Sequence, residues 1–243
     1  MSGAYFSRRS PQIKKCMKKS IISLLTLLCA FQANASTITW GTPTSIVDID
    51  DFLTTGTFVE AYNVGGSATT VGGINFTAAA TLNASGVTGG RVFSNTFLPF
   101  PTTTGDNSYD NLLLGAQIES TYLTIGKGGL LVDGQEYSLQ IWVNDSRALA
   151  VGRTVSFNTG DNSVTLDVNQ GADTLGYTVV GTFIYDENNR FGGNPNTLHL
   201  TTSGSAGAVI NAYALYAIPE PASFALLAAG LVGALVVVRR RRS

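Results

Sequence analysis

Cysteine, histidine and charged residues are all scarce in this chain of 243 residues. It has 2 cysteines and 1 histidine, and charged residues make up 13% of it. The segment from Ser36 to Ile218 has only five basic residues against 15 acidic ones, which gives it a charge of −10. Contact with phosphates needs a cationic surface, so nucleic acid is excluded as a partner. Disorder is not expected either, because 44% of the residues are hydrophobic.

The N-terminus has the pattern of a secretory signal. Six of the 15 basic residues lie before residue 20, and the apolar run 21–31 follows them. Ala33 and Ala35 then occupy the two positions that signal peptidase reads. We therefore expect a signal peptide over 1–35 that uses the Sec machinery and is cut after Ala35. Two methionines are candidates for the true start, Met1 and Met17.

Both cysteines, Cys16 and Cys29, fall inside the predicted signal. The mature chain would therefore have no disulfide, no thiolate metal site and no thiol nucleophile. A secreted domain over 36–217 is long enough to fold on its hydrophobic core alone.

The C-terminus has the pattern of a membrane anchor. The run 222–238 is apolar apart from Ser223, and it spans about 25 Å as a helix, near the short limit for crossing a bilayer. A basic cluster follows it, formed by Arg239, Arg240, Arg241 and Arg242. Such a cluster stays in the cytoplasm, so the bulk of the protein is expected outside the inner membrane.

Pro219, Glu220 and Pro221 stand just before that run, and the two prolines keep the tripeptide extended. This motif, a short apolar span and a terminal arginine cluster together resemble the PEP-CTERM sorting signal of Gram-negative, biofilm-forming bacteria, a tail also labelled an ice-binding protein C-terminal domain. The resemblance covers 218–243. It implies recognition by exosortase, a membrane protease-transpeptidase that would cut near the motif and release or re-anchor the protein at the cell surface.

The segment 36–217 shows alternating apolar and polar residues and no helical period. The clearest run is 136–144, and similar short runs recur with Asp-Gly, Asn-Pro and Gly-rich turns between them. Asp133-Gly134 after the apolar 130–132 predicts a hairpin into that run. This pattern favours an all-β fold, an antiparallel β-sandwich of the jelly-roll type.

Trp142 is the first candidate for ligand binding. It shares the polar face of its predicted strand with Gln140 and Asn144, and an exposed aromatic ring there could bind an extracellular polysaccharide. The alternative is that Trp142 packs against the second sheet or a covering loop.

Calcium is the candidate metal, and no other cofactor is expected. Asp106, Asn107 and Asp110 could offer oxygens from one loop. The alternative is ordinary turn chemistry, because the spacing is not that of an EF-hand. His199, the single histidine, alternates with two leucines and is expected to face solvent.

Three functions remain open from the sequence. The first is a non-catalytic surface or matrix protein, and the second is a carbohydrate-binding module. The third is a small polysaccharide-cleaving enzyme, because a glycosidase needs only two carboxylates placed by the fold. Acidic clusters occur at 48–51 and 186–187, where excess acid would also serve solubility. We expect no enzymatic activity.

Overall fold

The computed structural model describes residues 37–79, 86–88, 91–94, 104–145, 150–159, 162–169, 175–189, 196–205 and 207–219. These residues form mostly β-strands, with one short α-helix, which confirms the expected all-β class. The predicted signal 1–35 and the predicted anchor 222–238 lie outside them. Within the described part of the chain, no helix is both long and apolar enough to cross a membrane.

The largest sheet has eight strands in the order β1-β13-β10-β16-β3-β5-β4, with β2 also paired to β13. Their bounds are Thr39–Trp40 (β1), Thr44–Ser45 (β2), Thr57–Val64 (β3), Thr69–Val71 (β4), Ile74–Ala79 (β5), Glu136–Val143 (β10), Tyr177–Ile184 (β13) and Ala212–Ala217 (β16). The strands pair antiparallel with one exception, the parallel pair of β3 and β5. The expectation of a purely antiparallel arrangement is wrong at this one place.

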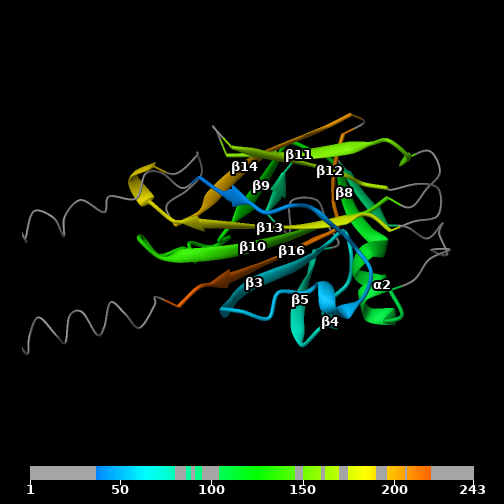
Figure 1. Ribbon diagram of the computed structural model, residues 1–243, viewed down its shortest axis with the longest axis horizontal. Coiled ribbons are helices and arrows are strands. Elements are labelled where there is room, and N and C mark those ends of the chain that lie inside the picture. The colour runs from blue at the N-terminus through cyan, green and yellow to red at the C-terminus, as the bar shows by residue number, and fades with distance from the viewer. Residues whose placement is uncertain are drawn as a thin grey trace, which may run out of the picture. The chain divides into compact units, whose positions relative to one another are not determined.

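Two smaller sheets complete the described fold. A five-stranded sheet has the order β12-β11-β14-β9-β6, and a three-stranded sheet has the order β15-β8-β7. The bounds are Val87–Thr88 (β6), Arg91–Ser94 (β7), Gly115–Ser120 (β8), Tyr122–Ile125 (β9), Thr154–Asn158 (β11), Ser163–Asp167 (β12), Leu198–Gly204 (β14) and Ala208–Ile210 (β15). Figure 1 shows β9, β11 and β14 in a layer facing β10, β13 and β16 of the large sheet.

The main hydrophobic core lies between these layers. The alternation predicted for β10 is confirmed, because every second residue of this strand belongs to this core: Tyr137, Leu139, Ile141 and Val143. Leu123 of β9 and Leu200 of β14 meet them from the opposite sheet. Packing of two sheets through alternating apolar side chains is the stabilising principle of a β-sandwich.

A second core covers the other face of the large sheet, and the sequence did not predict it. It is built by helix α2 (Asn107–Leu114), the segment around the 3-10 helix η1 (Ile49–Asp51), and strands β4 and β5. The expectation of no helix is wrong, since α2 buries its apolar side with a three- and four-residue spacing, through Tyr109, Leu112 and Leu113. The central strands of the large sheet, β10 and β16, are therefore buried on both faces.

Other predicted strands are confirmed with small changes. The run 209–216 is divided at Asn211 into β15 and β16, and the run 177–185 forms β13, which ends one residue earlier at Ile184. The predicted hairpin is only half right, because Asp133 and Gly134 form a turn but 130–132 is not a strand. A further 3-10 helix, η3 (Glu187–Asn189), follows β13.

Candidate functional site

Trp142 is buried, so the predicted exposed aromatic platform is wrong. Its side chain is 0% exposed and packs in the second core against Phe52 and Phe76, with ring centroids 4.9 and 5.8 Å away. The indole Nε1–H donates to the hydroxyl of Tyr109 on α2 at 3.0 Å. The alternative prediction, that Trp142 packs beneath a covering segment, is confirmed.

Gln140 and Asn144 are buried beside it and hold the covering layer on the sheet. Gln140 Oε1 accepts from Leu53 N at 2.9 Å, and its Nε2 donates to Asp51 O at 2.5 Å. Asn144 Oδ1 accepts from Gly176 N at 2.9 Å. Buried amides need such partners, so these two residues are structural and are not available to a surface glycan.

The residues of the predicted calcium loop begin helix α2. Asp106 is the N-cap, and its Oδ1 accepts from Ser108 N at 2.7 Å and from Tyr109 N at 2.9 Å. Asp110 Oδ1 accepts from both N and Oγ1 of Thr104 at 2.8 Å. Asn107 is the first residue of the helix. A calcium ion would have to compete with these donors, and calcium binding stays a prediction.

The two acidic clusters also bond to nearby backbone. At 48–51, Asp51 Oδ2 accepts from Val47 N at 2.6 Å and from Asp48 N at 3.2 Å, and the second of these bonds is part of a capping box at the start of η1. At 186–187, Glu187 Oε2 accepts from Asn196 N at 2.9 Å and from the hydroxyl of Tyr185. No group of three or more metal-binding side chains gathers within the described ranges.

His199 lies on the outer face of β14, as predicted, while Leu198 and Leu200 on either side of it are buried. It is half-buried beside Tyr122, with a ring-centroid distance of 6.0 Å. This partial burial lowers the pKa of the imidazole below its ordinary value.

Glu60 is an unusual buried carboxyl that the sequence reasoning missed. Its side chain faces the main core from β3 and is 6% exposed. Oε1 accepts from Gly126 N at 2.6 Å and from the hydroxyl of Tyr213 at 3.4 Å, while Oε2 is buried without a described partner. Burial raises the pKa of Glu60 from 4.5 to about 7, against the opposing effects of these bonds and of Lys127. The available sequence signal was its position two residues before Tyr62, which packs against the main core from the same strand.

A shallow hollow of about 390 Å³, the aromatic hollow, opens beside the ends of β3 and β16. Phe58 is 47% exposed there and meets Tyr216 edge to face at 6.1 Å. The hydroxyl of Tyr216 is buried and has no hydrogen-bond partner among the described residues, and burial raises its pKa to about 12. None of the described residues that line this hollow is charged. The lining residues are Leu53, Thr54, Gly56, Phe58, Gly72, Gly73, Ile74, Asn75 and Tyr216.

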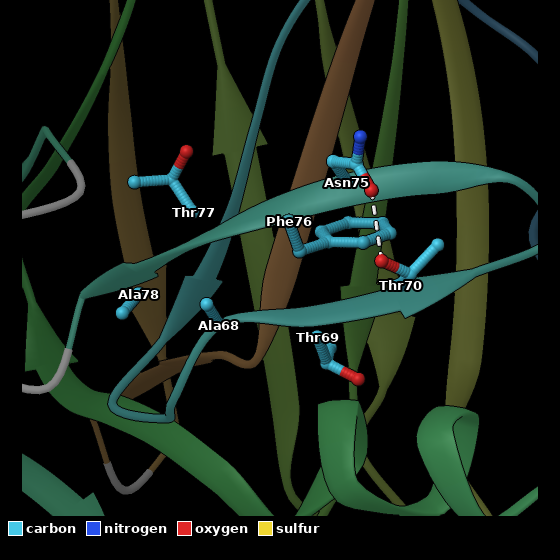
Figure 2. A pocket seen from close by; sticks show the side chains of 7 residues that line it. All are labelled: Ala68, Thr69, Thr70, Asn75, Phe76, Thr77 and Ala78. Atoms are coloured by element: carbon cyan, nitrogen blue, oxygen red, sulfur yellow. Dashed lines mark hydrogen bonds between the residues drawn. The ribbon is translucent and has the colours of Figure 1, made fainter.

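A second hollow of about 720 Å³ lies along β4 and β5 (Figure 2). Its exposed side chains are those of threonines, alanines and Asn75, and Thr70 Oγ1 donates to Asn75 Oδ1 at 2.8 Å across the two strands. Phe76 points the other way, into the second core. Asn75 lines both hollows, so the two adjoin.

The last described strand, β16, ends just before the predicted sorting motif. Ile218 N donates to Glu136 O at 2.9 Å, and Ile218 O accepts from Gln135 Nε2 at 2.6 Å. Pro219 is exposed and is the last described residue. Glu220, Pro221 and Arg239 to Arg242 lie outside the described residues, as do Ala33 and Ala35 at the other terminus.

The tail matches a known family. Residues 217–242 match the PEP-CTERM protein-sorting motif. This confirms the resemblance drawn from Pro219 to Pro221, the apolar span and the arginines. The match covers only the tail.

Comparisons of the whole chain give little more. No curated protein matches it. A solved structure of a calcium-binding mutant of Bacteroides uniformis beta-glucuronidase 2 is similar, with a TM-score of 0.45 and 12% sequence identity over 72% of this chain. This chain covers 19% of that protein, and a likeness at this level carries no conclusion about activity.

Proposed function

We propose that this protein is an exported, non-catalytic component of the cell surface or extracellular matrix, delivered by processing of its C-terminal tail. The observation that carries the proposal is the tail itself, which matches a sorting motif over 217–242. The membrane protease that reads this motif, an exosortase, would be its partner. The 36–217 segment would be the exported β-sandwich, which we propose to be of the jelly-roll type.

The position of the motif supports processing. Ile218 is bonded to Glu136 at the start of β10 and to Gln135 just before it, while Pro219 is exposed. A protease needs an extended segment outside the folded domain, and the two prolines supply one. Cleavage there would leave every described strand intact, because β16 ends at Ala217.

Intact-mass measurement of the protein from cell-surface and membrane fractions tests the proposal. We expect the surface form to lack 1–35 and the residues beyond the motif. Replacing Pro219, Glu220 and Pro221 with alanine should leave an uncut form in the inner membrane, whereas the matched tail variant Ser223→Ala should be processed normally. A full-length, tail-bearing protein in the cytosol would contradict the proposal.

Carbohydrate binding is a second candidate function, favoured by the aromatic hollow instead of Trp142. An exposed ring next to small polar groups is the usual setting for a sugar. Phe58 supplies the ring, and the absence of charge among the described lining residues favours a neutral saccharide. Binding to an array of neutral oligosaccharides should be lost in Phe58→Ala and kept in Tyr122→Ala, which removes an equally exposed aromatic residue from the other sheet. Equal binding by both variants would refute this site.

A further inference from the structure

The described fold begins and ends at the same end of the large sheet. At the N-terminal side, β1 pairs antiparallel with β13, Thr39 lying opposite Thr182, so the chain enters beside the end of β13. At the C-terminal side, β16 ends at Ala217, beside the start of β10. Ile184 at the end of β13 lies opposite Glu136 at the start of β10. We call this end of the large sheet, where β13 and β16 end and β10 starts, the exit end. The arrowheads of β13 and β16 point toward it in Figure 1.

The connection from the exit end to the predicted anchor is very short. Only 219–221 separate Ile218 from the apolar run that begins at Ala222. Even a fully extended chain would cover only about 14 Å from Ile218 to Ala222. The headgroup region takes up about half of that reach, since a bilayer is about 40–45 Å thick around a core of about 30 Å.

The length of the apolar run draws the domain closer still. The 17 residues of 222–238 span about 25 Å as a helix, which is less than the thickness of a typical hydrocarbon core. A short span is accommodated by pulling its flanking segments toward the bilayer or by thinning the bilayer. Because Ile218 is bonded to Gln135 and Glu136, the sheet must follow its tail.

The exit end exposes large apolar side chains. Val132 is 62% exposed and Leu130 is 45% exposed in the loop before β10. Ile184 at the end of β13 is 40% exposed, and Phe58 at the start of β3 is also exposed. Val132 N donates to the hydroxyl of Tyr137 at 2.8 Å, which holds this loop against β10. An exposed group of apolar side chains marks an interaction surface. Here the short connection to the predicted anchor places this surface next to the bilayer.

We propose that the exit end, formed by Phe58, Leu130, Val132 and Ile184, rests on the extracytoplasmic leaflet of the inner membrane until the tail is processed. The proposal rests on the membrane-anchored tail of the proposed function. The occupant is the neutral headgroup layer and the lipid beneath it. Asp133 and Glu136 lie at the same end, so anionic lipid weakens the contact.

The absence of cysteine from the mature chain allows a direct test. The full chain, with Cys16 and Cys29 replaced by serine, receives one cysteine at Val132 or at Val151 and an environment-sensitive fluorophore on it. Val151 is the matched control, because it is 50% exposed and follows the opposite end of β10. The chains are reconstituted into phosphatidylcholine vesicles that contain spin-labelled lipid. We expect blue-shifted emission and strong quenching at 132, neither at 151, and a smaller effect at 132 when phosphatidylglycerol is added.

A second variant checks that the apolar surface causes the contact. Val132→Asp should reduce the quenching of a fluorophore at Ile184, and Val151→Asp should leave it unchanged. Equal quenching at 132 and 151, or no quenching at 132, would overturn the proposal.

Trypsin added outside the vesicles separates this proposal from the proposed function. Arg239 to Arg242 should be protected in the lumen if the tail spans the bilayer. Unprotected arginines would contradict the anchored tail itself. Protected arginines without quenching at 132 would overturn only the contact between the exit end and the lipid.

Discussion

Replacing Glu60 with glutamine should change how the stability of the domain depends on pH. Glu60 is 6% exposed, and burial raises its pKa from 4.5 to about 7. Between these two values the folded state holds a proton that the unfolded state has released. The free energy of unfolding therefore falls as the pH rises from 4.5 to 7, and the loss is complete above pH 7.

The size of this effect follows from the shift. A displacement of about 2.5 pH units corresponds to roughly 3 kcal/mol at 1.36 kcal/mol per unit. Glutamine keeps an acceptor for Gly126 N but cannot ionise. We therefore expect the free energy of unfolding of Glu60→Gln, relative to that of the wild type, to rise by about 3 kcal/mol between pH 4.5 and pH 8.

Denaturant unfolding of the full chain in mild detergent measures the difference. Its two tryptophans, Trp40 and Trp142, both lie in the folded domain and report its unfolding. Taking the difference between variant and wild type at each pH cancels every group that titrates alike in both. The exposed Glu136→Gln controls for the loss of one acidic side chain. A difference between Glu60→Gln and wild type that stays constant from pH 4 to pH 8.5 would refute the reasoning.

Substitutions at three further positions are tested by the same unfolding assay: Trp142 and Asp106 belong to the second core and its helix, and Gly126 lies against Leu131 of the main core. Trp142→Ala should lower the free energy of unfolding by about 3–5 kcal/mol, because it empties a fully buried site, and a near-neutral result would contradict the burial. Asp106→Ala should cost about 1 kcal/mol through loss of the helix cap, while Asp106→Asn should cost much less. Gly126→Ala should cost more than about 1 kcal/mol, because Gly126 has a φ of +72° and a Cβ would lie 2.5 Å from the side chain of Leu131; an unchanged midpoint would argue against this backbone conformation.

The sequence predicted the strands well but not what covers them. Alternation placed Leu139 and Ile141 inside and Trp142 on the opposite face, and all three assignments are correct. The error was to equate the opposite face with solvent. Alternation distinguishes the two faces of a strand, but it contains no information about whether a distant segment covers the second face.

Helix α2 was within reach of sequence reasoning. Asp106 is a good N-cap, and Tyr109, Leu112 and Leu113 follow it at helical spacing. The same acidic and amide residues were interpreted as a calcium loop, because caps and oxygen-rich loops use the same residue types. The apolar residues that follow distinguish the two, since a helix places them on one face.

Glu60 and the exit end depend on register, which the sequence does not contain. Glu60 alternates with apolar residues on β3, but only the folded chain brings Gly126 and Tyr213 to its carboxyl oxygen. Likewise, nothing in the sequence shows that the start of β1 and the end of β16 lie at one end of a sheet. That follows from the pairing of β1 with β13, β13 with β10, and β10 with β16.

This pairing has a consequence for export. Strands in a sheet lie about 4.8 Å apart, so β1 and β16, three strand spacings from each other, enter and leave the domain about 14 Å apart. A chain held in the membrane at both termini can close this sheet without either segment leaving the bilayer, because neither strand has to reach the far end of the domain to meet its partner. On the proposal made above, the domain can therefore be complete before the signal or the tail is cut, and, once the signal is removed, the exit end would leave the lipid only when the tail is processed.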